Sequence, residues 1–217
     1  MIRRKKILFI GAHFDDLEIA CGGAIQFFLN KKYDVSIYVI TNSQIIDLNT
    51  KKIIRKKSKS KKEFLKSCKI LGIKKFYLEN LETNKLVFHD NLISKIRKMV
   101  EKISPDIVFC HWDKDVHQDH SAVGKSCLSA CRHLDNLFMY RSNYYESTDI
   151  FKENFYIDIS NYFQNKIHAI KCYTSELKRV NYLWVEMVKN RDRLNGLINH
   201  TEYAESFCCV KCLINKF

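Results

Sequence analysis

Lys6-Ile7-Leu8-Phe9-Ile10 consists of a lysine followed by four apolar residues, and the run ends at Gly11. A run without polar alternation is typical of a strand that is covered on both faces of a sheet. Apolar residues then recur at helical spacing over residues 17–29, and residues 34–41 form a second run rich in β-branched side chains. This order predicts a strand, a helix and a second strand, which together make a βαβ unit.

The same alternation continues along the rest of the chain. Apolar runs predict further strands at residues 76–78, 106–110, 137–140 and 155–159. Helical periodicity predicts helices over 63–71, 92–103 and 122–134, and a long helical region over 162–198. Together these elements predict an α/β fold, a Rossmann-like, mostly parallel sheet with helices on both faces. Because 217 residues suffice for one such core and are too few for two, we expect a single domain over residues 1–217.

The chain is strongly basic, with 37 Lys+Arg against 24 Asp+Glu and a net charge of +13. Proteins with such a charge often bind nucleic acid, an anionic membrane surface or an acidic small molecule. Lysines on solvated faces give the same total charge without any such partner. A basic block over residues 51–62 is interpreted as a solvated helix face or a loop. Because it follows the second strand, we expect it to rim the crevice there and to attract an anionic substrate.

The cysteine content and the hydropathy pattern bear on the compartment. Nine cysteines show no repeating framework, which argues against a secreted disulfide scaffold and favours a reducing cytoplasm. No apolar stretch approaches the ~18 residues of a membrane span. The C-x-x-C pair of Cys209 and Cys212 has no second pair, so we interpret both as buried thiols. The sequence predicts a soluble cytoplasmic protein without a membrane span.

Two short segments are rich in residues that bind metals, and each directly follows a predicted strand. They are Gly11-Ala12-His13-Phe14-Asp15-Asp16-Leu17-Glu18 and His111-Trp112-Asp113-Lys114-Asp115-Val116-His117-Gln118-Asp119-His120. In open α/β sheets, ligands and catalytic groups collect just beyond the carboxyl ends of the strands. We therefore expect the two segments to meet at one site.

The first segment supplies what a hydrolytic zinc site needs. Such a site uses about three His, Asp, Glu or Cys ligands, an open position for water and a base near that water. His13 and Asp16 are three residues apart and can turn toward a common point. Asp15 then remains available as the base.

The second segment repeats that spacing. His117 and His120 are three residues apart, and Asp119 between them can hold an imidazole tautomer by hydrogen bonding. The other ionisable residues are candidates for contacts around the site, since capping and turn formation explain them equally well: Glu18, His111, Asp113 and Asp115.

These motifs resemble those of the LmbE-like or PIG-L-like zinc-dependent N-acetylglucosaminyl deacetylases. That family's first motif reads Ala-His-Pro-Asp-Asp, its second ends in His-x-Asp-His, and a Tyr-Ala-Glu-x-Phe pattern follows near the C-terminus. The matching segments here are Ala12-His13-Phe14-Asp15-Asp16, His117-Gln118-Asp119-His120 and Tyr203-Ala204-Glu205-Ser206-Phe207, with Arg193 and Gly196 before the last. Phe14 replaces the usual proline and leaves both flanking ligand positions in place.

The resemblance implies a metal-dependent amidohydrolase that removes acetyl from a small-molecule N-acetylated amino sugar. The implied roles are His13, Asp16 and His120 as ligands of one Zn²⁺ per chain, Asp15 as general base and acid, His117 as donor to the oxyanion, and Asp119 as the group that orients His117. Many relatives also carry Arg-x-x-Glu in a helix before Leu-Gly. Here Glu63 has Ser60 at that offset and Arg55 is the nearest arginine, so that contact with substrate does not carry over directly.

Other interpretations remain open. Residues 115–120 come within one residue of the His-x-His-x-Asp-His motif of metallo-β-lactamase-like hydrolases, which are β-sandwiches between helices and give the His13 segment no role. A nucleic-acid or anionic-surface binding module would use the charge, but the chain lacks an interleaved aromatic and basic platform, so no specific nucleic acid is expected. Tyr182, Trp184, Met187 and Leu194 form a stripe that we interpret as core packing, which leaves homo-oligomer formation through it as the alternative.

Overall fold

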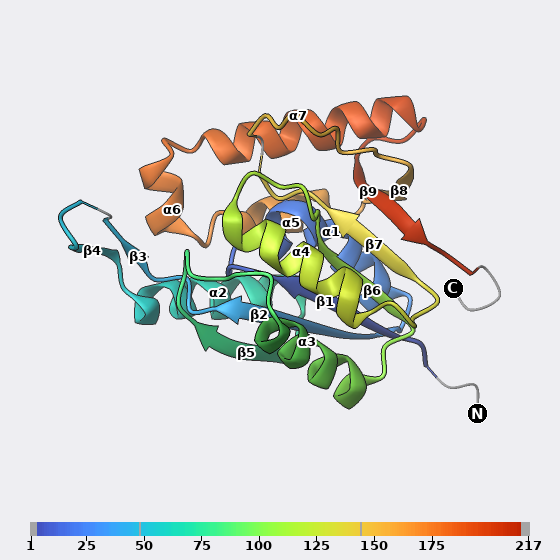
Figure 1. Cartoon of the computed structure of the whole chain (residues 1–217). Helices are drawn as coiled ribbons and strands as arrows, with labels where there is room; N and C mark the ends of the chain where they lie inside the picture. The colour runs from blue at the N-terminus through green and yellow to red at the C-terminus, as the bar shows by residue number, and fades with distance from the viewer. Residues whose placement is uncertain (1–3, 48, 144, 214–217) are drawn as a thin grey trace.

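A seven-stranded sheet forms the centre of the protein in a computed structural model that describes residues 4–47, 49–143 and 145–213 (Figure 1). The strand order is β5-β2-β1-β6-β7-β9-β8. The strands are β1 (Lys6–Gly11), β2 (Asp34–Thr41), β5 (Phe76–Leu81), β6 (Ile107–His111), β7 (Leu137–Tyr140), β8 (Phe155–Asp158) and β9 (Ala204–Lys211). The five strands from β5 to β7 pair in parallel, and β9 runs antiparallel to both β7 and β8. The predicted α/β fold with a mostly parallel sheet is confirmed, and the β-sandwich of the metallo-β-lactamase-like alternative is excluded.

Helices cover both faces of this sheet, as predicted. They are α1 (Asp16–Asn30), α2 (Lys57–Leu71), α3 (Asp90–Ile103), α4 (Gln118–Ala130), α5 (Phe163–Ile170), α6 (Thr174–Arg179) and α7 (Leu183–Ile198). Side chains alternate along β1, so that Ile7 and Phe9 join the core under α1, α2 and α5, whereas Leu8 and Ile10 join the core under α3 and α4. This two-sided burial explains why β1 has no polar alternation.

Three expectations need correction. The long helical region over residues 162–198 is divided into α5, α6 and α7, and the second break falls at Asn181 and Tyr182, whose φ angles of 48° and 60° cannot continue a helix. The fourth helix begins at Gln118 rather than at residue 122. Cys209 is only half-buried and Cys212 is exposed, because β8 covers β9 only from Ala204 to Phe207.

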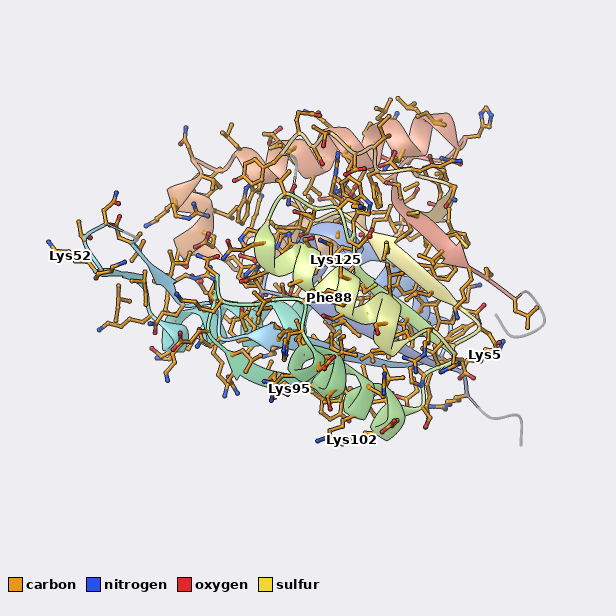
Figure 2. The ribbon with its side chains drawn as sticks, viewed as in Figure 1. Lys5, Lys52, Phe88, Lys95, Lys102 and Lys125 are labelled. Atoms are coloured by element: carbon orange, nitrogen blue, oxygen red, sulfur yellow. The ribbon has the colours of Figure 1, made fainter. Side chains whose placement is uncertain are left out.

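The basic block is divided between two elements. Residues 53–55 form β4 (Ile53–Arg55), which pairs antiparallel with β3 (Ile45–Ile46) in a hairpin, and residues from 57 onward form the first turns of α2. The hairpin projects at the end of the molecule where α2 and α6 also lie (Figure 1). Lys52 lies at its tip and points away from the sheet (Figure 2).

Helix α1 is held in place by a buried ionic cluster behind the sheet. The Glu205 carboxylate accepts hydrogen bonds from the backbone N–H groups of Gly23 at 2.8 Å and Ala24 at 2.7 Å. Lys166 Nζ lies 2.8 Å from Glu205 Oε1 and 2.5 Å from Asp192 Oδ2, and all three side chains are fully buried. Glu205 of the Tyr-Ala-Glu segment is therefore a structural residue that fixes the helix following the first motif.

Close packing at this cluster depends on Gly23. A Cβ atom added there would lie 2.5 Å from Cγ2 of Ile159, which is too close for two non-bonded carbon atoms. Gly23 is thus the place where the segment before α5 approaches α1. In the described part of the chain, no helix is long and apolar enough to cross a membrane.

A Lys166→Met variant is expected to lose about 3–5 kcal/mol in the free energy of unfolding, because removing one member of a buried ion pair leaves uncompensated charge. Glu205 would lose its ion-pair partner, and Asp192 would keep only Arg191, whose Nε lies 3.2 Å from Asp192 Oδ1. Urea denaturation followed by circular dichroism measures this loss. The matched control is Lys171→Met, one turn further on and exposed, for which we expect a change within about 0.5 kcal/mol. Equal midpoints for the two variants would show that the cluster contributes nothing.

Candidate metal centre

The two histidine- and aspartate-rich segments meet as predicted, because they follow neighbouring strands. β1 and β6 pair in parallel, and the first segment leads from β1 into α1 while the second leads from β6 into α4. From β1 the chain proceeds to β2 on one side, and from β6 it proceeds to β7 on the other. The strand order reverses between β1 and β6, which is where open α/β sheets form their ligand-binding crevice.

The three predicted ligands His13, Asp16 and His120 converge at this point. His13 Nδ1 lies 3.1 Å from His120 Nε2 and 3.3 Å from Asp16 Oδ2, and His120 Nε2 lies 3.1 Å from Asp16 Oδ1. Tetrahedral zinc with nitrogen and oxygen ligands at about 2.0–2.2 Å keeps its ligand atoms roughly 3.3–3.6 Å apart. All three side chains are buried. Two imidazoles and a carboxylate at this spacing fit a zinc ion.

The other nitrogen of each imidazole of this group lies within 3.3 Å of a carboxylate oxygen. Asp119 Oδ2 lies 3.0 Å from Nε2 of His13, and Asp115 Oδ2 lies 3.3 Å from Nδ1 of His120. Carboxylates in this position fix the tautomer and orientation of metal-binding histidines. The ring nitrogens that face the centre are therefore Nδ1 of His13 and Nε2 of His120.

The charges of the centre favour a cation. Burial is the largest single effect and lowers the pKa of the two imidazoles, but the surrounding carboxylates together outweigh it: Asp16 and Asp119 raise the pKa of His13 to about 10, and Asp16 and Asp115 raise that of His120 to about 9. Burial raises the pKa of Asp16, yet the histidines around it hold the pKa of this carboxyl well below its usual range. The protons on His13 and His120 thus neutralise carboxylate charge in the centre. A bound metal ion would neutralise that charge in their place.

Asp119 does not contact His117 with its carboxylate, which corrects the predicted orienting role. Asp119 binds His13 and also accepts hydrogen bonds from the backbone N–H groups of Asn84 at 2.6 Å and Leu86 at 3.0 Å. Because Asp119 lies in the first turn of α4, its carboxylate reaches the neighbouring loop and the first segment, whereas His117 lies at the helix N-cap behind it.

The backbone of α4 sets the tautomer of His117 instead. Its Nδ1 accepts a hydrogen bond from the backbone N–H of Asp119 at 3.2 Å, so the ring proton lies on Nε2. Burial, together with the charges of His120 and His13, lowers the pKa of His117 to about 4. His117 is therefore a neutral imidazole with an Nε2–H donor.

His111 is the further histidine that the structure brings to the centre. Its Nε2 lies 3.0 Å from Asp16 Oδ2, and with Asp16 and His120 it forms one alternative group of metal-binding atoms, while His13, His117 and His120 form another. The same Nε2 accepts a hydrogen bond from the backbone N–H of Ala12 at 3.0 Å, which occupies the lone pair that a metal would need. We therefore favour His13 over His111 as the third ligand.

The remaining ionisable residues of the two segments, Asp115, Glu18 and Asp113, differ in what they contact. Asp115 contacts His120, as described. Glu18 accepts hydrogen bonds from the hydroxyls of Ser67 at 2.5 Å and Tyr173 at 2.8 Å, and burial raises its pKa to about 8. Asp113 is half-buried, and its backbone carbonyl accepts a hydrogen bond from Ser121 Oγ. Glu18 and Asp113 are thus explained by packing and turn formation.

Asp15 lies beside the ligand group with Arg55 as its neighbour. Arg55 Nη1 lies 3.7 Å from Asp15 Oδ2 and 3.0 Å from Glu176 Oε1, and Arg55 Nε donates a hydrogen bond to the Ser43 carbonyl at 3.1 Å. Burial raises the pKa of Asp15, and the Arg55 guanidinium counteracts that rise. The Ser60 hydroxyl donates to the same Ser43 carbonyl at 2.8 Å. An arginine does reach this site, therefore, but from β4 and not from α2.

A cavity of about 460 Å³ opens over the centre. Its polar lining includes Asp15 and His117, and α7 with the turn before it supplies an apolar wall of Val180, Leu183, Trp184 and Met187. The prediction of core packing for the stripe of Tyr182, Trp184, Met187 and Leu194 needs correction. Trp184 and Met187 line this cavity, whereas Tyr182 and Leu194 are exposed.

Comparisons with known proteins agree with this arrangement. The family model "PIG-L: GlcNAc-PI de-N-acetylase" matches residues 8–131, which include both segments. The chain is similar to the uncharacterized deacetylase YaiS of Escherichia coli strain K12, with 30% identity over 146 residues that cover 64% of this chain and 75% of that protein.

Solved structures show the same fold at low sequence identity. The N,N'-diacetylchitobiose deacetylase of Pyrococcus horikoshii superposes with a TM-score of 0.81 at 20% identity, covering 95% of this chain and 84% of that one. The 4-carboxy-2-hydroxymuconate hydratase GalB of Pseudomonas putida superposes with a TM-score of 0.77 at 16% identity, covering 95% and 96%. Because a deacetylase and a hydratase share this fold, the fold alone does not define the reaction.

Proposed function

The chain belongs to the PIG-L family of de-N-acetylases, and on that premise we propose that it is a zinc-dependent hydrolase that removes the acetyl group from an N-acetylated amino sugar of the N-acetylglucosaminyl type. The observation that carries this proposal is the group His13, Asp16 and His120, with Asp15 and His117 at the edge of the same cavity. We further propose a cytoplasmic location, which is supported by nine cysteines that form no disulfide.

His13, Asp16 and His120 would hold the zinc ion, which supplies Lewis acidity and makes water a nucleophile at neutral pH. Asp15 takes the proton from the attacking water as a bond forms between the water oxygen and the acetamide carbon. The carbon–nitrogen bond then breaks, and Asp15 returns the proton to the departing amine. Water and amide are consumed, and acetate and free amine are formed.

His117 stabilises the negative charge that develops on the carbonyl oxygen. Its proton is on Nε2 because Nδ1 already accepts the backbone N–H of Asp119, and its lowered pKa keeps the ring neutral. A neutral donor strengthens its hydrogen bond as the oxygen becomes an anion. Asp119 acts through His13, whose ring it holds.

A His117→Ala variant is expected to lose about 100–1,000-fold in kcat, the usual effect of removing one oxyanion donor. Zinc content is expected to stay near that of the wild type, because His117 is not among the three proposed ligands. Acetate release and metal analysis measure the two quantities. His168→Ala, which removes an exposed histidine of α5, is the control and should keep full activity. A variant with normal kcat would remove His117 from the mechanism.

The proposed function itself is tested by acetate release and amine formation across a panel of N-acetylglucosaminyl compounds, with the metal counted in the same preparation. We expect about one zinc per chain and stoichiometric acetate and free amine from at least one compound. A zinc-loaded protein that releases no acetate from any of them, or one that hydrates a carbon–carbon double bond, would overturn the proposal.

A further inference from the structure

Helix α7 carries apolar side chains on two opposite faces. Its inner face packs on the rest of the protein through Val185 and Val188, which are buried. Its other face carries a second stripe, called here the outer stripe, which consists of Leu183, Met187, Asn190, Leu194, Leu197 and Ile198. At 3.6 residues per turn, these six side chains lie within about 100° of one another around the helix axis. A helix that packs on a protein through one face normally has charged and polar residues on the opposite face.

The outer stripe is exposed along most of its length. Its four aliphatic members Leu183, Leu194, Leu197 and Ile198 are between 57% and 60% exposed. Helix α7 lies at the edge of the molecule, on the side away from α3 (Figure 1). Single exposed apolar residues are ordinary on a monomer, but a contiguous apolar patch marks an interaction surface. The outer stripe is therefore a candidate interface.

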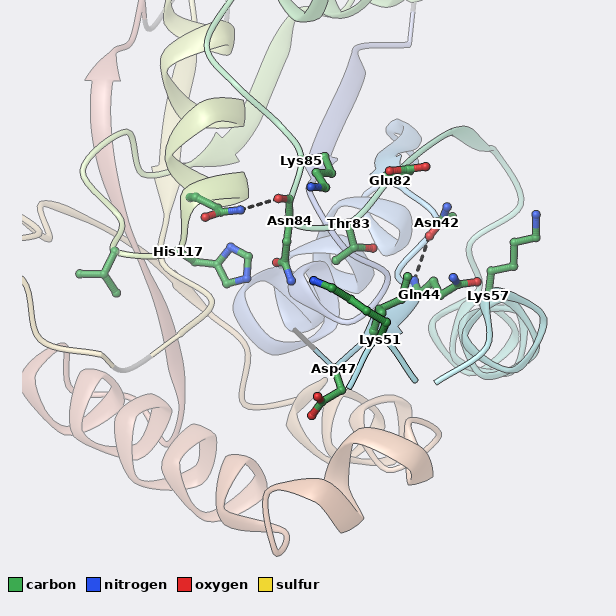
Figure 3. Close-up of a pocket in the computed structure, with 13 residues that line it drawn as sticks. Asn42, Gln44, Asp47, Lys51, Lys57, Glu82, Thr83, Asn84, Lys85 and His117 are labelled. Atoms are coloured by element: carbon green, nitrogen blue, oxygen red, sulfur yellow. Dashed lines mark hydrogen bonds between the residues drawn. The ribbon is translucent and has the colours of Figure 1, made fainter. Parts of the chain in front are cut away.

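The outer stripe borders the catalytic cavity and lies apart from a second cavity. That second cavity, of about 810 Å³, lies between the β3–β4 hairpin and the loop after β5, where Lys51 and Asn84 line it (Figure 3). No residue of the outer stripe, all of which the structure describes, lines this second cavity. Leu183 and Met187 line the catalytic cavity, although Leu183 is also exposed to solvent. A molecule seated on the outer stripe would cover Leu183 and extend the apolar wall of the catalytic cavity.

The charges beside the outer stripe are complementary to those of a second copy of the same helix. Glu186 and Arg193 flank the stripe on the same side, and Asn190 lies between them in the sequence. Two copies of α7 that pack antiparallel about a two-fold axis near Asn190 bring this flank of each helix against the same flank of the other. Glu186 of each copy then lies beside Arg193 of the other.

The contacts that these two side chains make within one chain leave that pairing open. Glu186 Oε1 lies 2.9 Å from Lys189 Nζ, in an exposed ion pair of a kind that contributes little to stability. Arg193 donates through Nη1 alone to the Glu202 carbonyl at 2.7 Å, and its side chain is exposed. Both ends of the charged flank are thus accessible to a second copy.

The apolar side chains match in the same antiparallel arrangement. Leu183 of one copy lies against Leu197 and Ile198 of the other, at both ends of the pair. Asn190 is the single polar member of the stripe, and it meets the Asn190 of the second copy near the axis, where two amides can hydrogen-bond to each other. The patch is therefore self-complementary, as an interface with two-fold symmetry requires.

We propose that the outer stripe is the interface of a two-fold dimer, in which α7 of one copy packs antiparallel on α7 of a second copy and Glu186 pairs with Arg193 across the interface. The dimer does not depend on which substrate the metal centre hydrolyses.

The oligomeric state in solution tests this interface. We expect sedimentation velocity over a micromolar concentration series to show a species of twice the 25.7 kDa of one chain. Leu194→Glu is expected to weaken the dimer by at least about a hundredfold, because it buries an unpaired carboxylate from each copy near the axis. Leu194 is exposed in the single chain, so the variant should keep the circular dichroism spectrum of the wild type. The control is Leu65→Glu, the same change at an exposed position of α2, which should dimerise as the wild type does.

Charge reversal tests the antiparallel arrangement. Glu186→Arg and Arg193→Glu each place like charges opposite each other at both ends of the interface, and each is expected to weaken the dimer by about tenfold. The double variant restores both pairs with reversed sign and should regain most of the wild-type affinity. An effect confined to one chain, such as loss of the contact between Arg193 and the Glu202 carbonyl, would not be rescued in this way.

Three outcomes would overturn the proposal. The first is a wild type that stays monomeric throughout the series, including one whose outer stripe binds phospholipid vesicles instead. The second is a dimer that Leu194→Glu leaves intact. The third is a double charge variant that dimerises no better than the two single variants, which would exclude the antiparallel pair.

Discussion

An Asp15→Asn variant is expected to lose at least about a hundredfold, and up to about ten-thousandfold, in kcat while it retains its zinc. General acid–base groups contribute about 10²–10⁴ in rate, and an amide of the same shape can neither take a proton from water nor return it to an amine. Asp15 is suited to this role because it lies at the edge of the cavity and outside the ligand group, with Arg55 Nη1 at 3.7 Å.

The measurements for this variant are single-substrate kinetics of acetate release and zinc content of the same sample. Asp113→Asn is the matched control, because it changes the same residue type in the second segment at a position that lines neither cavity. We expect that control to keep wild-type kcat. Full activity in Asp15→Asn would show that another group moves the proton, and loss of zinc would show that Asp15 is a ligand.

Removal of the metal is expected to abolish activity, and one equivalent of zinc is expected to restore it. His13 Nδ1 and His120 Nε2 lie 3.1 Å apart, and each lies within 3.3 Å of one of the two Asp16 carboxylate oxygens, so no other part of the proposed mechanism can replace the ion. Removing a residue that only hydrogen-bonds to a metal ligand lowers metal affinity roughly 10–100-fold. In a His120→Ala variant, which lacks a ligand itself, zinc affinity should fall by more than that. Added zinc should then not restore activity at stoichiometric concentration.

Thermal unfolding gives an independent measure of the same site. Zinc at about 100 times its dissociation constant stabilises the folded wild type by about 2.7 kcal/mol, which raises Tm by several degrees. The His120→Ala variant should show no such rise at that concentration, whereas His133→Ala, an exposed control outside both cavities, should match the wild type. Chelator-treated protein that remained fully active would contradict metal dependence altogether.

Much of the sheet could be predicted from local patterns. Residues 6–11, 34–41 and 107–111 are buried along nearly their whole length, so their apolar runs carry a clear signal for covered strands. The hairpin was not predictable in the same way. β3 consists of Ile45 and Ile46 alone, and β4 of three residues, so neither is long enough to produce a periodic pattern.

The break after α5 is set by tertiary packing rather than by a helix-breaking residue. Residues 162–198 contain no proline, and the only glycine among them, Gly196, lies near the end of α7. The chain turns at Tyr173, whose hydroxyl lies within hydrogen-bonding distance of the Phe14 carbonyl and of the Glu18 carboxylate in the first segment. That contact joins residues about 155 positions apart, and no local pattern contains it.

The sequence by itself determined which residue types stand at the ends of β1 and β6, and therefore that metal-binding side chains gather there, because side-chain chemistry and strand order follow from local composition. Only the tertiary structure decided which carboxylate faces which imidazole. Asp119 is two residues from His117 in sequence, yet its carboxylate binds His13, because the first turn of α4 directs it toward the loop of Asn84 and Leu86. Arg55 likewise reaches Asp15 only through the fold of the hairpin. Spacing along a chain limits which side chains can meet, but the packing of separate segments selects the pairs that do.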